Sequence, residues 1–167
     1  MKRNLYLLPL VATAILASCD SAEVSPRQSS ITSNNGMNAR LDETDWKALS
    51  EHTRAASRAG VATIVGTQFV GSSYSKQITL QVKDFTKVGT YTTDQVEANV
   101  TINNLTGRSS QSWSTDGEGT AASVTVTAYD EKTSSISGTF SFIAKGTTGT
   151  EYKKVTMGVF TDVKIQK

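Results

Sequence analysis

Cys19 has the most distinctive side-chain chemistry of this sequence, since it is the only cysteine among the 167 residues. Its thiol is a nucleophile that can form a stable thioether, a disulfide or a metal bond. Leu16, Ala17 and Ser18 come directly before it, and a basic start with Lys2 and Arg3 opens the chain. A mostly apolar run of thirteen residues, 5–17, separates these two features. This layout indicates covalent modification of Cys19 rather than catalysis.

The apolar run is too short to cross a bilayer, which takes about 20 residues, but it fits the roughly 7–15-residue apolar region of a secretory signal. The Leu16-Ala17-Ser18-Cys19 sequence resembles the lipobox of bacterial lipoproteins. In that family the thiol receives diacylglycerol, a signal peptidase cuts before the cysteine, and the new amino terminus is acylated. The resemblance implies that residues 1–18 are a lipoprotein signal peptide, cut between Ser18 and Cys19. Acyl chains such as palmitate on Cys19 would then hold the protein stably at a membrane.

Cleavage at this position changes the charge of the protein. Residues 1–18 hold two of the 17 Lys and Arg residues and none of the 15 Asp and Glu residues, so the mature chain is formally neutral. A neutral chain with mixed signs lacks the basic footprint of a nucleic-acid-binding protein, and we expect no nucleic-acid partner. A lipidated Cys19 also leaves no thiol for a disulfide, for catalysis or for a metal.

Catalytic groupings are sparse in the rest of the chain. His52 is the only histidine, so a Ser-His-Asp triad would have to use it, and we expect it to be an exposed surface residue. Zinc needs three or four His, Cys or carboxylate ligands, and no glycine-rich phosphate loop precedes a helix and a lysine. A pair of carboxylates in one cleft, as in glycoside hydrolases, cannot be excluded from linear sequence. We expect no catalytic residues, no metal and no cofactor.

Trp113 is the one weak candidate for a ligand-binding residue. It lies in the polar stretch 108–118 and could stack on a sugar ring or a partner. The favoured interpretation is a core position on a short strand, with serines on either side facing outward. Trp46 and Tyr91 are core candidates on the same reasoning.

The sequence as a whole predicts three segments: the signal peptide at 1–18, a lipidated flexible tether at 19–35 and an all-β domain at 36–167. The tether is polar and poor in apolar residues. Segment 42–58 fits either a helix or a β-hairpin from its pattern alone. Later residues alternate between apolar and polar, which is typical of antiparallel strands. Turns are expected at 71–73, 103–104, 116–119, 130–132 and 146–149. Together these features predict an antiparallel β-sandwich or flattened barrel of about 8–10 short strands.

Several motifs resemble those of uncharacterised small lipoproteins of Bacteroidota. They are Met37-Asn38-Ala39, Trp46-Lys47-Ala48, Gly89-Thr90-Tyr91, the run 136–142 (Ile-Ser-Gly-Thr-Phe-Ser-Phe) and the run 155–165 (Val-Thr-Met-Gly-Val-Phe-Thr-Asp-Val-Lys-Ile). The resemblance favours the hairpin at 42–58, although Asp42-Glu43-Thr44 replaces the usual Asp-Gly turn. Within 136–142, Phe140 and Phe142 should share a core-facing side, and Gly138 should permit a bulge or a close backbone approach.

The resulting hypothesis is a lipid-anchored cell-envelope protein, at the outer membrane rather than the inner one, on its periplasmic or surface side. We expect a non-catalytic binding or accessory module whose ligand is a glycan, a lipid or an envelope protein. The alternatives are an envelope hydrolase that uses carboxylates and a purely structural envelope lipoprotein.

Overall fold

The structure is a computed structural model that describes residues 36–166. The expected signal peptide, Cys19 and the tether therefore lie outside the described residues. Within this range the regular elements are strands and one 3-10 turn. In chain order they are β1 Gly36–Leu41, β2 Thr44–Leu49, η1 Ser50–His52, β3 Thr53–Arg58, β4 Val61–Val70, β5 Tyr74–Val82, β6 Gly89–Thr92, β7 Val96–Asn104, β8 Ser109–Ser114, β9 Ala121–Asp130, β10 Ser135–Gly146 and β11 Tyr152–Gln166.

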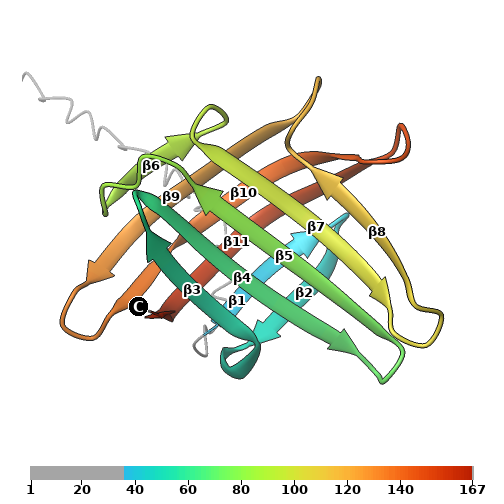
Figure 1. The fold of residues 1–167 in the computed structure, drawn as a ribbon, viewed down its shortest axis with the longest axis horizontal. Coiled ribbons are helices and arrows are strands. Elements are labelled where there is room, and N and C mark those ends of the chain that lie inside the picture. The colour runs from blue at the N-terminus through green and yellow to red at the C-terminus, as the bar shows by residue number, and fades with distance from the viewer. Residues whose placement is uncertain (1–35, 167) are drawn as a thin grey trace, which may run out of the picture. The chain divides into compact units, whose positions relative to one another are not determined.

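The eleven strands of the described range form one hydrogen-bonded sheet that folds over itself into two layers (Figure 1). One layer holds β3, β4, β5, β7 and β8, and the other holds β2, β1, β11, β10, β9 and β6. Strands of the two layers cross at a steep angle (Figure 1). The all-β prediction is confirmed, and the strand number exceeds the expected 8–10. Short strands such as β3 and β6 are too brief for alternation to separate them from loops.

Two junctions join the layers and close the barrel. The end of β11 pairs in parallel with β3, Ile165 opposite Ala55. The end of β10 pairs with β8, Gly146 opposite Trp113. The closed circuit runs β11-β3-β4-β5-β7-β8-β10, with β1 and β2 attached beside β11 and β9 and β6 attached beside β10. This circuit is a flattened barrel, one of the two architectures that the alternating pattern left open.

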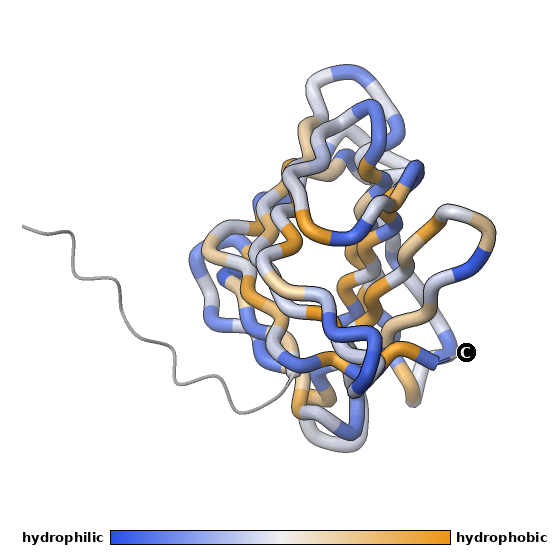
Figure 2. The backbone as a smooth tube through the Cα atoms, turned by 90° about the vertical axis from the view of Figure 1, so that its left-hand side faces the viewer, coloured by the Kyte–Doolittle hydropathy of each residue, from blue (hydrophilic) through white to orange (hydrophobic). Residues whose placement is uncertain are grey.

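Apolar and polar residues alternate along the strands (Figure 2), and the apolar ones fill the space between the layers. Ile78, Leu80 and Val82 are fully buried, as their alternation predicts. Phe140 and Phe142 are also buried and stack at a centroid distance of 6.4 Å. Burial of each such side chain contributes about 1.5–3 kcal/mol. The interior of the barrel is thus a packed core.

Gly138 is needed because the backbone of β9 and a core ring approach it closely. A Cβ at this position would lie 2.2 Å from the carbonyl oxygen of Thr125 and 2.5 Å from the ring of Phe160. The predicted close approach is confirmed. Bulges at Met157 (φ 52°) and Asp162 (φ 48°) bend the neighbouring strand β11. Because bulges increase local twist, they help β11 to leave its own layer and reach β3.

Segment 42–58 contains the β1–β2 hairpin turn, strand β2, the turn η1 and strand β3, so the hairpin is confirmed and the helix is wrong. Trp46 and Ala48 alternate into the core at 2% and 1% exposure, which a strand permits. Asp42 and Glu43 form the two-residue turn with positive φ at both positions (47° and 64°). The carboxylate of Asp42 accepts hydrogen bonds from the backbone N–H of Lys154 (2.9 Å) and from the amine of Lys153 (2.6 Å).

One predicted turn lies elsewhere. Asn103 and Asn104 are the last residues of β7, and the turn follows at residues 105–108. The side chain of Asn104 explains the difference, because its Oδ1 accepts from the backbone N–H groups of Thr106 (3.1 Å) and Gly107 (2.8 Å). Asparagine therefore stabilises this turn from the strand position before it.

Candidate functional site

Trp113 lies near the end of β8 with its side chain turned inward, and it is only 4% exposed. The amine of Lys153 lies 5.2 Å from the centroid of its ring. A buried ring with a cation over one face offers no open platform for a sugar. Its position is therefore the core position that the flanking serines predict.

A hollow of about 360 Å³ nevertheless opens beside Trp113, between β8 and the turn that joins β10 to β11. Its lining supplies amide, hydroxyl and carboxylate groups around the indole: Gln111, Ser112, Trp113, Gly146, Thr148, Gly149, Thr150 and Glu151. We call this site the Trp113 hollow. Such polar groups around one aromatic residue suit a polar ligand better than an apolar one.

Backbone hydrogen bonds fix the walls of the Trp113 hollow. The backbone N–H of Gly146 donates to the carbonyl of Glu151 at 2.7 Å, which closes the β10–β11 turn. Thr147 ties this turn to β8, since its N–H and its hydroxyl both donate to the carbonyl of Ser112, at 3.0 and 3.1 Å. Gly146 lies directly beside the indole, since a Cβ there would be in van der Waals contact with Nε1 of Trp113, at 3.5 Å.

The indole N–H of Trp113 is buried and has no hydrogen-bond acceptor among residues 36–166. The indole N–H of Trp46, by contrast, donates to the carbonyl of Lys76 at 3.1 Å. An unsatisfied buried donor costs about 1–3 kcal/mol, and such a group in a folded protein often marks a functional or water site. Because this N–H is closed to solvent, an acceptor in the hollow can bond to it only after a local movement of the groups around it.

Charge beside the Trp113 hollow is balanced by an ion pair between two elements. Lys153 of β11 pairs with Asp42 of the β1–β2 turn at 2.6 Å, and its side chain is 24% exposed. This pairing holds the Lys153 amine over the indole. Asp42 thus connects the hairpin turn to the wall of the hollow, a link between residues far apart in sequence that no local pattern signals.

A second hollow, of about 420 Å³, contains two carboxylates and bears on the hydrolase alternative. It is lined by Ala128, Asp130, Thr133, Ser135, Ser137, Asp162 and Lys164. Hydrogen bonds from Thr133 and from the backbone N–H of Lys132 hold the pKa of Asp130 below its ordinary value. A general acid needs the opposite shift. The backbone N–H of Asp162 donates to the Ser137 hydroxyl (2.9 Å) at the β11 bulge. Asp130 and Asp162 therefore both have structural roles.

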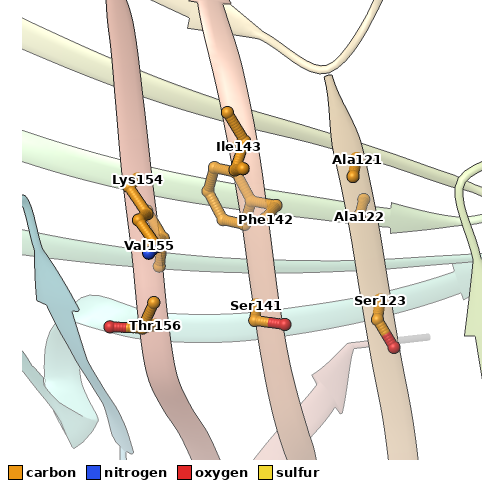
Figure 3. Close-up of a pocket in the computed structure, with 9 residues that line it drawn as sticks. All are labelled: Ala121, Ala122, Ser123, Ser141, Phe142, Ile143, Lys154, Val155 and Thr156. Carbon is orange, nitrogen blue, oxygen red and sulfur yellow. The ribbon is translucent and has the colours of Figure 1, made fainter. Parts of the chain in front are cut away.

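A third hollow, of about 250 Å³, crosses β9, β10 and β11 (Figure 3). The small side chains of Ala121 and Ala122 lie beside Phe142 and Ile143, while Ser123, Ser141 and Thr156 lie along one side (Figure 3). Its lining includes few groups that could orient a ligand.

His52 is exposed on η1, and its ring contacts Phe69 edge-on at 4.9 Å. Among residues 36–166, no group of three or more His, Cys, Asp or Glu side chains could hold a metal ion. Ser18 and Cys19 lie outside the described residues, so the cleavage and lipidation sites stay predictions. Within the described part of the chain, no helix is sufficiently long and apolar to span a bilayer.

The Trp113 hollow depends on residues that sequence reasoning did not single out. For Gly146 and the residues after it, the sequence predicts only a Gly-Thr-Thr-Gly turn at 146–149. That signal locates a turn but does not show that it folds against Trp113, which lies more than thirty residues earlier in the chain.

The strand circuit and its packed interior define a small closed all-β domain of the flattened-barrel type. The chain belongs to the family described as Domain of unknown function (DUF6252), whose model matches residues 33–164. That match includes all the strands named above except the last two residues of β11. No curated protein and no solved structure matches the chain.

Proposed function

We propose that this protein is a lipid-anchored, non-catalytic binding module of the cell envelope, which takes a glycan in the Trp113 hollow. The single observation that carries the ligand class is the buried indole N–H of Trp113, which has no acceptor in the described part of the chain and lies beside amide, hydroxyl and carboxylate groups. Sugars present many hydroxyl groups that both accept and donate hydrogen bonds, so they complement such a lining.

The proposed lipid anchor is inferred from the amino-acid sequence. The basic start, the apolar run and the Leu16-Ala17-Ser18-Cys19 motif support acylation of Cys19. The motifs shared with Bacteroidota lipoproteins support an outer-membrane location, on the periplasmic or surface side. Asp20 directly follows the cysteine, and acidic residues near this position accompany surface export in that group.

The packed interior supports a site at the rim of the barrel over one inside it. Ile64, Leu80 and Val100 are fully buried between the layers, so side chains occupy the space that a lipid-binding barrel would leave open. Polar residues instead line the Trp113 hollow. These observations favour a glycan over an apolar small molecule.

Nitrogen–proton NMR tests the ligand class directly, because the chain has two tryptophans and therefore two indole N–H signals. Titration with oligosaccharides of glucose, mannose and N-acetylglucosamine should shift the Trp113 signal and leave the Trp46 signal in place. The Trp46 N–H is already bonded to Lys76. Trp113→Phe assigns the signal by removing it.

Matched variants separate this site from the rest of the surface. Glu151→Gln and Gln111→Ala should weaken binding, whereas Ser141→Ala, in the third hollow, should not. A panel that shifts neither indole signal, or shifts that persist unchanged in Glu151→Gln and Gln111→Ala together, would contradict a glycan site here.

The anchor has its own test. Expression with labelled palmitate should label the wild-type protein and leave Cys19→Ala unlabelled, and mass spectrometry of the mature protein should find Cys19 at its amino terminus. A mature protein that begins elsewhere and carries no acyl chain would refute the anchor without affecting the ligand test.

A further inference from the structure

Five half-exposed apolar side chains surround one corner of the domain, and we call them the corner patch: Leu49, Phe69, Val70, Tyr74 and Leu105, each 45–52% exposed. They come from the end of β2, the β4–β5 hairpin and the β7–β8 turn, which lie along the lower edge of Figure 1. Exposed apolar groups that gather in this way mark interaction surfaces.

Backbone pairing, a hydrogen bond and a ring contact connect parts of the corner patch to their neighbours. Val70 and Tyr74 are paired across the β4–β5 ladder, and the backbone N–H of Leu105 donates to the carbonyl of Ser73 at 2.7 Å. On the other side, the ring of His52 packs against the ring of Phe69 at a centroid distance of 4.9 Å. His52 follows Leu49 by three residues. The patch is therefore drawn from three parts of the chain and wraps around the corner, with the consecutive residues Phe69 and Val70 on opposite faces of β4.

The described chain begins at the same corner. Gly36, the first residue of β1, pairs with Leu49, the last residue of β2. A Cβ on Gly36 would lie 3.3 Å from the backbone nitrogen of Ser50. The segment that leads back to Cys19 therefore leaves the domain beside the corner patch.

That segment is short. Residues 20–35 number sixteen and reach at most about 60 Å when fully extended. As the coil that their composition predicts, their ends would be about 23 Å apart. A lipidated Cys19 would hold the domain close to the bilayer, where even a weak apolar contact acts at a high effective concentration.

Charge at this corner also suits a lipid surface. The stretches 52–83 and 98–115, which include β3, β4, β5 and β8, contain no Asp or Glu. Of their basic residues, Lys76 and Arg108 lie near the corner patch, whereas Arg58 and Lys83 lie at the other end of the β4–β5 hairpin, where Lys83 pairs with Glu97. A bilayer with anionic headgroups attracts basic groups and repels acidic ones, so Lys76 and Arg108 favour its approach, while the exposed Glu51, two residues after Leu49, opposes it.

We propose that the corner patch rests on the bilayer that holds the acyl chains of Cys19, with Phe69 and Tyr74 in the headgroup region. The ring of Tyr74 carries a hydroxyl and favours that region, whereas the wholly apolar ring of Phe69 suits the boundary with the acyl chains. The inference rests on the proposed anchor and adds an orientation to it. The opposite corner of the domain, next to β6 (Figure 1), then faces away from the membrane.

Quenching by brominated lipid tests this orientation. The full-length mature lipoprotein is reconstituted in vesicles of phosphatidylethanolamine and phosphatidylglycerol that contain phosphatidylcholine brominated on its acyl chains. Phe69→Trp and Tyr74→Trp place a reporter in the corner patch. Val88→Trp is the matched control, because Val88 is 62% exposed and lies just before β6. The native tryptophans are 2% and 4% exposed and give all variants the same background.

We expect loss of the added emission in Phe69→Trp and Tyr74→Trp and unchanged emission in Val88→Trp. Vesicle-bound protein that shows no quenching in either patch variant, or equal quenching in Val88→Trp, would overturn the orientation while leaving the anchor intact, and would assign the patch to a second copy or a soluble partner. Wild-type protein that does not float with the vesicles would instead overturn the anchor, and the orientation with it.

Discussion

Trp46 and Trp113 have nearly the same burial but differ in the hydrogen bonding of the indole N–H. Trp46 donates to the carbonyl of Lys76, which belongs to the opposite layer of the barrel, so one polar bond joins the two layers through the core. Trp113 has no such acceptor among residues 36–166. This one hydrogen bond gives Trp46 a structural role, whereas the role of Trp113 in ligand binding is our proposal.

Replacement of each tryptophan by phenylalanine should reveal this difference. Both changes remove part of an indole from the core, but Trp46→Phe also removes a hydrogen bond and leaves a carbonyl partly unsatisfied. We expect Trp46→Phe to lower the free energy of unfolding by about 1 kcal/mol more than Trp113→Phe. Urea unfolding followed by circular dichroism measures both. Equal losses would mean that the unpaired N–H of Trp113 has an acceptor in solution.

Asp130 gives the stability of the domain an acid dependence. Hydrogen bonds from Thr133 and Lys132 lower its pKa in the folded state. The stabilisation is therefore present above the ordinary pKa of 3.8 and is lost as the pH falls through the lower folded value. Asp130→Asn keeps an acceptor oxygen but removes the charge. It should melt at a lower temperature than wild type at neutral pH, and the difference should disappear in strong acid. A constant difference across this range would contradict the linkage.

At the scale of elements, two hairpin turns contain residue types that do not suit the backbone conformation of the turn. Two-residue turns with positive φ at both positions favour Gly, Asn or Asp. The β3–β4 turn meets this preference at Gly60 (φ 78°) but not at Ala59 (φ 50°), and the β1–β2 turn meets it at Asp42 but not at Glu43. The contacts of Asp42 with Lys153 and Lys154 hold the β1–β2 turn in a conformation that Glu43 disfavours.

Adding a glycine to one turn and removing the glycine from the other should therefore have opposite effects on the free energy of unfolding. Glu43→Gly relieves a strained φ while retaining the carbonyl that accepts from Arg40, and we expect it to raise the free energy of unfolding by about 0.5–1 kcal/mol. Gly60→Ala should lower it by about 1 kcal/mol, purely through backbone strain, because no atom lies within 4 Å of the added Cβ. Chemical denaturation measures both changes. A stability loss in Glu43→Gly would show that the glutamate side chain has a stabilising role.

Elements with alternating residues were predictable from sequence because each strand buries one face. The runs around Ile78 and Phe140 specify their own inward sides, and Gly138 announces a close approach. Strand β3 was not predictable as a strand, since Ala55 is its only buried residue. The Trp113 hollow could not be predicted from the sequence either. Its shape depends on the register of β8 against β10, which is a tertiary property, and Trp113 itself gives the same pattern whether or not a hollow lies beside it.

At the scale of the whole molecule, closure depends on two short junctions. The one between β11 and β3 consists of two residue pairs, Ile165 with Ala55 and Gln166 with Ala56. It is supported by a hydrogen bond from the backbone N–H of Ile165 to the carbonyl of Ser134 at 2.8 Å. Ile165 also packs against the core. The last strand is therefore the element that turns two layers into a closed circuit.

Removal of residues 164–167 should open this junction. We expect the free energy of unfolding to fall by about 2 kcal/mol, from lost apolar burial and lost hydrogen bonds, and the backbone amides of β3 to exchange with solvent faster. Hydrogen exchange measured by NMR checks the second effect residue by residue. Removal of residue 167 alone is the control. Unchanged protection of Ala55 and Ala56 after the longer truncation would show that the core alone positions β3.

The sheet ends at β2 on one side and at β6 on the other, and both ends are poor templates for further pairing. β6 has only four residues, and β2 carries the exposed charges Asp45 and Lys47. Short or charged edge strands oppose strand-by-strand addition of a second molecule. If many copies are confined to one membrane plane, where neighbours meet often, this arrangement keeps them from joining their sheets into fibrils.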